Sequence, residues 1–175
     1  MIPEKFRLSL MQQQQIIDKT QYYIDTANRL LDQSCSPIAV KFDLRGKSSG
    51  MFVVKSNACL IRYNPVIFSQ FYQHALIHTV AHEVAHYIVH MIWDIRNVKP
   101  HGQEWIRLMN LFSVPAEVTS RYDISGLPLK QQQRHLYQCA CMQHSLSTTR
   151  HNKINRKQAV YTCKKCAQPL AYISS

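Results

Sequence analysis

Hydrophobic residues recur at helical spacing in three stretches of the chain. Residues 8–33 carry apolar side chains at this spacing and contain neither Gly nor Pro, which predicts an amphipathic helix. Residues 65–93 and 103–112 repeat the pattern, and the sequence VKPHG separates them. We therefore predict a long helix that is followed, after a sharp turn, by a shorter amphipathic helix.

Between the first two helical stretches lie three short runs of β-prone residues, IAVKF, MFVV and CLIRY. The segments RGKSSG and KSNA separate these runs and are typical of turns. We predict that the runs form a small antiparallel sheet, which ends at Asn64-Pro65. The order of helix, strands, long helix and helix predicts an α+β fold.

A change in composition divides the chain near residue 125. Ser125-Gly126 and Pro128 open a basic, glutamine-rich stretch that is typical of a linker. Beyond it, short β-prone pieces carry cysteines: HLYQCACMQ, AVYTCKKC and PLAYI. We predict one domain over residues 1–125 and a small module over residues 126–175.

Composition favours a soluble, globular, cytoplasmic protein with no membrane partner. The chain has 175 residues, of which 46% are hydrophobic. Its start lacks the pattern of a signal peptide, and no stretch reaches the roughly 18 apolar residues that a membrane span needs. In a reducing compartment, clustered cysteines are more often metal ligands than disulfides. Where the six cysteines cluster, they are therefore candidate metal ligands.

Positive charge is concentrated toward the end of the chain. Lys and Arg number 21 against 10 Asp and Glu, for a net charge of +11, and residues 121–175 hold nine basic residues against one acid, Asp123. This imbalance predicts a polyanionic partner, most often DNA or another nucleic acid. The alternative is a solvated basic face without a partner.

Histidine recurs at every fourth position along the second helical stretch, at residues 74, 78, 82, 86 and 90. One metal ion can reach only one adjacent pair, because the series spirals around a helix. Only His82 is followed directly by a carboxylate, Glu83, which is also the only charged residue between Arg62 and Asp94. A buried carboxylate is costly unless a cation or hydrogen bonds compensate it.

HEVAH at residues 82–86 therefore matches HExxH, in which two histidines one turn apart bind zinc and the glutamate acts as a base toward a water molecule. A structural zinc site would need a fourth protein ligand instead of a base, so the motif favours catalytic zinc held by His82 and His86, with Glu83 as the base. The alternative is a pair of hydrogen-bonded histidines in a buried helix.

The third zinc ligand is open from these residues alone. His101, between Pro100 and Gly102, lies at a turn that would hold its side chain rigidly. Glu104, about one helical turn later, suits the other common choice, a glutamate on the following helix, and Glu117 lies further downstream.

The cysteines after residue 138 predict a second zinc ion with a structural role. Cys163 and Cys166 form a CxxC pair, and Cys139 and Cys141 form a shorter CxC pair, for which His144 offers a substitute ligand. Four ligands would close the coordination shell and stabilise a module too small for a large core. The remaining cysteines, Cys35 and Cys59, are predicted to be small buried hydrophobic residues.

Between the two cysteine pairs lies STTRHNKINRKQ, predicted to be an extended basic loop. It contains no acidic residue, and its cations suit phosphate contacts that carry no base specificity. The candidate nucleic-acid-binding residues are Arg150, Lys153, Arg156 and Lys157. The flanking Tyr137 and Tyr161 are interpreted as packing residues rather than as platforms for base stacking.

Four segments together resemble the SprT-like zincin metalloproteases: HEVAH, HGQEW at 101–105, LFSVPA at 111–116, and residues 137–170 with their cysteine pairs. That group is related to the Spartan proteases, which cleave proteins crosslinked to DNA. The resemblance implies a zincin-like core, with His82, His86 and His101 as zinc ligands and Glu83 as the base, followed by a zinc-ribbon-like module. By analogy with zincins, MFVV or CLIRY would supply the edge strand that aligns a protein substrate.

Two other functions are consistent with the same residues. The first is a nucleic-acid-binding or transcription-associated protein that keeps a metal-bound zincin fold without proteolysis. The second is a peptidase without a nucleic-acid partner, whose basic tail is only a solvated face.

Overall fold

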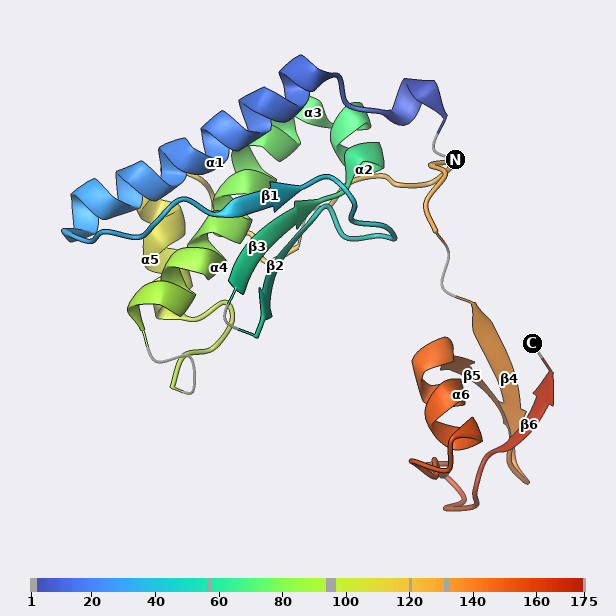
Figure 1. Ribbon diagram of the computed structural model, residues 1–175. Helices are drawn as coiled ribbons and strands as arrows, with labels where there is room; N and C mark the ends of the chain where they lie inside the picture. Colours follow the sequence, from blue (N-terminus) through green and yellow to red (C-terminus); the bar gives the residue numbers. More distant parts are fainter. Residues whose placement is uncertain (1–2, 57, 94–96, 120, 131–132, 175) are drawn as a thin grey trace. The chain divides into compact units, whose positions relative to one another are not determined.

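The computed structural model describes residues 3–56, 58–93, 97–119, 121–130 and 133–174 (Figure 1). The chain forms two compact units, Met1–Leu129 and Lys130–Ser175. None of the helices in the described ranges is long and apolar enough to cross a membrane. The structure is a mixed α+β arrangement with a small sheet in each unit.

Helix α1 (Leu10–Leu31) confirms the first predicted helix and follows a 3₁₀ turn, η1 (Glu4–Phe6). A reciprocal capping box starts the helix, since the Ser9 hydroxyl accepts from the Gln12 main chain while the Gln12 side chain accepts from the Ser9 main chain. One face of the helix is buried at helical spacing, including Ile16, Tyr23 and Ile24. This face packs against α4.

The sheet of the first unit is mixed, not antiparallel as predicted. Strand β2 (Gly50–Lys55) pairs antiparallel with β3 (Ala58–Tyr63), but β1 (Ala39–Lys41) pairs parallel with β3 on its other side. The main-chain N–H of Leu44 donates to the Tyr63 carbonyl, which holds the segment after β1 against the end of β3. The resulting order, β1-β3-β2, makes β3 central and leaves β2 at an edge.

The predicted long helix over residues 65–93 is divided into pieces. Helix α2 (Pro65–Gln70), which the Asn64 side chain caps, ends at Phe71. Helix α3 (Tyr72–His74) then runs through a π-helical segment, η2 (Ala75–Thr79), into α4 (Val80–Ile92). HEVAH therefore lies on a 13-residue α-helix that begins two residues before His82.

Helix α4 is central to the first unit. It contacts β2 and β3, and both α1 and α5 (Gln103–Leu111) pack on it (Figure 1). Val80, Val84 and Ile88 have no exposed surface, while Leu76 is half-buried. Full burial of each such aliphatic side chain contributes roughly 1.5–3 kcal/mol, so this row fixes how the helix is rotated.

The second unit contains a three-stranded antiparallel sheet of order β5-β4-β6. Its strands are β4 (Arg134–Gln138), β5 (Gln143–Ser147) and β6 (Ala171–Ser174). The predicted basic loop is wrong in part, because Thr148–Asn155 forms a helix, α6, that packs on β4 and β5. This stretch contains neither Gly nor Pro, and it turns its less polar face to the sheet.

Candidate metal centre

Three histidine side chains converge at one point in the first unit. His82 and His86 lie one turn apart on α4, and His101 lies in the turn before α5. The Nε2 atoms are 3.1 Å apart for His82–His86 and for His86–His101, and 3.2 Å apart for His82–His101. Tetrahedral bonds of about 2.0–2.1 Å would place nitrogen ligands about 3.3 Å apart. The spacing therefore suits a shared metal ion.

The protonation of these rings also suits a metal. Burial lowers the pKa of His82 to about 4, with a further contribution from His101, and lowers that of His86 to about 3, with contributions from both neighbours. Burial also lowers the pKa of His101. At neutral pH the rings are therefore uncharged, the form that binds metals. The main chain of Glu117 accepts a hydrogen bond from His82, which helps to orient its ring.

The Trp105 side chain packs against the rings of the three histidines. Its ring is fully buried and lies 4.8 Å from the rings of His82 and His101 and 6.0 Å from that of His86, measured between ring centroids. Its indole N–H donates to the main-chain carbonyl of His82 at 3.3 Å. The tryptophan of HGQEW thus connects α5 to the start of the metal motif.

Glu83 is buried next to this cluster, with 7% of its surface exposed. Its Oε2 atom accepts a hydrogen bond from the Phe52 main-chain N–H at 2.7 Å. Burial raises the pKa of the carboxyl to about 7, although the Phe52 hydrogen bond lowers it in part. A cation bound by the adjacent histidines would favour the carboxylate. The side chain is therefore suited to taking up and releasing a proton.

The other candidate ligands do not join the three histidines. Among the described residues, the groups able to hold a metal are His82, His86 and His101 in the first unit and four cysteines in the second. Glu104 is not in the first group. His90 lies outside this group, and the centroid of its ring is 5.6 Å from that of Phe52.

The four predicted cysteines also converge. The ligand atoms of Cys139, Cys141, Cys163 and Cys166 lie within 4.8 Å of one another. The Sγ atom of Cys141 lies 3.5 Å from that of Cys139 and 3.7 Å from that of Cys163. Zn–S bonds of about 2.3 Å would give tetrahedral S···S distances of about 3.8 Å. His144 is adjacent, with Nε2 3.3 Å from Cys139 Sγ.

The predicted nucleic-acid-binding residues lie on and just after α6. Arg150 and Lys153 are three residues apart on the helix, Arg156 is its C-cap, and Lys157 follows. All four side chains are exposed. The helix presents these cations to solvent while His151 bonds inward to the Tyr137 hydroxyl at 3.0 Å.

Packing accounts for the remaining predicted residues. Tyr137 is fully buried, as expected of a packing residue, and Tyr161 is half-buried with the Arg150 guanidinium 5.6 Å from its ring centroid. Cys35 and Cys59 are half-buried rather than buried, and both pack against the core of the first unit.

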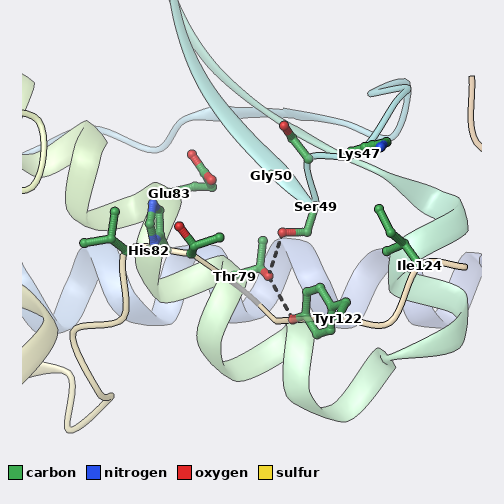
Figure 2. Close-up of a pocket in the computed structure, with 11 residues that line it drawn as sticks. Lys47, Ser49, Gly50, Thr79, His82, Glu83, Tyr122 and Ile124 are labelled. Carbon is green, nitrogen blue, oxygen red and sulfur yellow. Dashed lines mark hydrogen bonds between the residues drawn. The ribbon is translucent and has the colours of Figure 1, made fainter. Parts of the chain in front are cut away.

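A cavity of about 270 Å³ opens beside His82 and Glu83 (Figure 2). The loop before β2, the end of η2, the beginning of α4 and residues 118–119 and 121–124 form its walls. The Thr79 hydroxyl bonds both to the Ser49 hydroxyl and to the Tyr122 hydroxyl, each at 3.2 Å. Tyr122 also bonds to His74 Nδ1 at 3.0 Å and stacks on Phe71. These contacts hold Tyr122 against the helix.

Sequence reasoning did not assign roles to several residues of this site. Trp105 stands four residues after His101, so a periodicity argument could have placed it on the face that meets the histidines. Gly50, Phe52, Thr79 and Tyr122 carry no motif, because their roles depend on contacts between distant segments.

The residues of the first unit that build this site lie within a stretch that matches a known family. The model of the SprT-like family matches residues 20–124. The chain belongs to the SprT-like family. Its curated relatives include Protein SprT of Vibrio parahaemolyticus, 35% identical over 150 residues that cover 85% of this chain and 87% of that protein.

Two further SprT proteins extend the comparison. Protein SprT of Yersinia pestis is 32% identical, and the match covers 96% of this chain and 95% of that protein. Protein SprT of Actinobacillus succinogenes is 33% identical, and the match covers 87% of this chain and 86% of that protein. These relatives therefore span both units of this SprT-like chain. No solved structure matches it.

Proposed function

We propose that this SprT-like chain is a zinc-dependent endopeptidase with a zincin core, which cleaves proteins bound or crosslinked to DNA. The observation that carries the proposal is the buried carboxylate of Glu83 beside three converging histidine nitrogens. In a purely structural metal site, a buried carboxyl that is not a ligand would cost free energy without contributing to metal binding. A hydrolytic site needs one as its base.

In this mechanism His82, His86 and His101 would hold zinc. The bound metal would polarise the substrate carbonyl and acidify a water molecule. Glu83 accepts a proton from a water molecule while the oxygen of that water bonds to the carbonyl carbon of the substrate. The same carboxyl then delivers the proton to the peptide nitrogen as the C–N bond breaks. The Phe52 N–H orients the carboxylate for both transfers.

The sheet offers a way to align an extended substrate. The sequence offered MFVV and CLIRY as candidate edge strands. MFVV lies in β2, which is at an edge of the sheet, whereas CLIRY lies in β3, which is central. Phe52 directs its N–H away from β3 to Glu83, and in an antiparallel pair Gly50 and Val54 direct their main-chain groups to the same side. A substrate strand added along this edge would pass beside Glu83.

The second unit would recruit the enzyme to DNA. Zinc held by Cys139, Cys141, Cys163 and Cys166 would stabilise a zinc-ribbon-like fold. This fold would present Arg150, Lys153, Arg156 and Lys157 to phosphates. These residues make no base-specific arrangement, so we propose binding without sequence preference.

The test compares wild type with Glu83→Gln at matched zinc content. The substrates are an unfolded protein and a DNA-crosslinked protein, each with and without DNA. DNA-stimulated cleavage that the variant lacks would support the proposal. If wild type cleaves neither substrate while both proteins bind zinc and DNA equally, the chain is instead a nucleic-acid-binding protein with a metal-bound core. Cleavage indifferent to DNA and salt would indicate a peptidase without this partner.

A further inference from the structure

The cavity beside Glu83 has the size of a subsite for one amino-acid side chain. Its volume of about 270 Å³ is below the roughly 300–1,000 Å³ of pockets for drug-sized ligands. Figure 2 shows Ser49, Thr79 and Tyr122 together on its wall, with Glu83 and His82 toward one end. The cavity is therefore continuous with the proposed catalytic centre.

The direction of proton transfer tells which substrate residue this cavity receives. This step rests on the proposed function, in which Glu83 passes the water proton to the leaving nitrogen. That nitrogen must lie within hydrogen-bond reach of the carboxyl, and it belongs to the residue after the scissile bond. The side chain of this residue starts one bond from the nitrogen. A cavity lined by Glu83 is thus within its reach.

The cavity wall is polar and is held in place. The hydroxyls of Ser49, Thr79 and Tyr122 form a hydrogen-bonded chain that His74 extends. Thr79 donates its hydroxyl proton to Ser49 and therefore accepts from Tyr122, so of these three hydroxyls Ser49 has a proton that can turn to a ligand. Because the chain joins three separate segments of the first unit, the wall is formed before a substrate binds.

The charge of the residues that line the cavity determines which substrate side chains it favours. Among the described residues that line the cavity, Lys47 and Glu83 carry a formal charge, and Lys47 is exposed. Glu83 already accepts the Phe52 N–H. A metal ion on the adjacent histidines would add further positive charge. A substrate Lys or Arg would meet the like charge of Lys47, whereas a substrate carboxylate would meet Lys47 and the Ser49 hydroxyl.

We propose that this cavity binds the side chain of the residue following the scissile bond, and that Lys47 makes it selective for an acidic residue. Cleavage would then leave Glu or Asp at the new N-terminus of the product. Lys47 is a specificity-determining residue in this proposal and takes no part in bond breaking.

The experiment maps cleavage sites in a peptide library by mass spectrometry for wild type, Lys47→Gln, Lys47→Glu and the control Arg45→Gln. Arg45 is an exposed cation in the same loop that does not line the cavity. We expect acidic residues after the scissile bond to be favoured about two- to fivefold over their amides, the range of an exposed ion pair. Lys47→Gln should remove this preference, Lys47→Glu should shift it to Lys and Arg, and Arg45→Gln should retain it.

A second measurement is independent of turnover. Fluorescence anisotropy would compare two labelled peptides that differ by Glu against Gln at this position, on zinc-loaded Glu83→Gln protein with and without Lys47→Gln. Tighter binding of the Glu peptide, lost with Lys47→Gln, supports the subsite even if wild type cleaves nothing. Equal binding of the two peptides overturns it.

Other outcomes separate this inference from the proposed function. Wild-type cleavage with no acidic preference, or a profile that Lys47→Glu leaves unchanged, overturns the subsite and leaves the peptidase in place. If Lys47→Gln lowers only DNA-stimulated cleavage without altering the profile, Lys47 contacts nucleic acid, and the acidic selectivity is wrong.

Discussion

Gly50 lies directly against Glu83, and no other residue type would fit there without movement. A Cβ atom at Gly50 would be 2.6 Å from Cγ, 2.7 Å from Oε1 and 2.9 Å from Cδ of Glu83. The same carboxyl is held by Phe52, two residues further along β2. The edge strand therefore sets the position of the proposed base through both contact and hydrogen bonding.

Gly50→Ala should displace the Glu83 carboxyl and lower kcat/KM for protein cleavage roughly 10- to 100-fold, the cost of a misplaced catalytic group. Metal content should be unchanged, because the three atoms nearest to the new methyl group all belong to Glu83 and not to a histidine. Met51→Ala is the matched control, since Met51 is exposed on the same strand. Activity of Gly50→Ala equal to that of Met51→Ala would show that the carboxyl adjusts freely.

His101→Ala should abolish tight metal binding in the first unit, whereas Glu104→Gln should retain it. His101 supplies one of three converging nitrogens, and changes in groups that merely orient ligands already weaken metal affinity about 10- to 100-fold. Metal analysis after dialysis against a weak chelator, with the second unit's metal as an internal reference, measures the difference. Equal loss in both variants would place Glu104 among the ligands.

Cys163→Ser should unfold the second unit and leave the first intact. The second unit has few buried apolar side chains, and binding of structural zinc by small zinc-finger peptides supplies about 10–16 kcal/mol of folding free energy. Amide hydrogen exchange, read separately for residues 1–129 and 133–174, would locate the loss. Cys59→Ser is the control, as Cys59 lies outside the cluster. Normal protection of residues 133–174 in Cys163→Ser would contradict a metal-dependent fold.

Replacing Arg150, Lys153, Arg156 and Lys157 together by Gln should weaken binding to DNA of any sequence. The slope of log K against log salt should become shallower by up to about 3–4, since each phosphate contact contributes about 0.9. A four-site control in the first unit replaces exposed cations with the same net change of charge: Lys5, Arg29, Lys41 and Lys55. If both variants lose affinity equally, the effect is net charge rather than a site on α6.

The sequence allowed the metal motif to be predicted because its parts are local. His82 and His86 are one helical turn apart, so the helical pattern alone places them together. His101 was harder, since Glu104 lies one turn away and only the fold shows which side chain faces α4. The convergence of the cysteines follows similarly from two short-range pairs.

Features that depend on pairing between distant segments could not be predicted in this way. The sequence of β1 is typical of any β-prone run and does not indicate a direction of pairing. Its parallel pairing with β3 depends on the segment after β1, in which Leu44 bonds to Tyr63. Helix α6 lacks a strong apolar stripe, so tertiary packing against β4 and β5 determines it. The cavity brings together Lys47, Thr79 and Tyr122, which share no local pattern.

The π-helical segment Ala75–Thr79 determines how α3 is rotated about the helix axis relative to α4. A π-turn holds more residues per turn than an α-helix, so removing one residue would rotate the preceding part by about 100° relative to HEVAH. Phe71 and His74, which hold Tyr122, would turn away, while His82 and His86 would keep their places. A one-residue change in helix length could thus rebuild the wall of the cavity without altering the metal ligands.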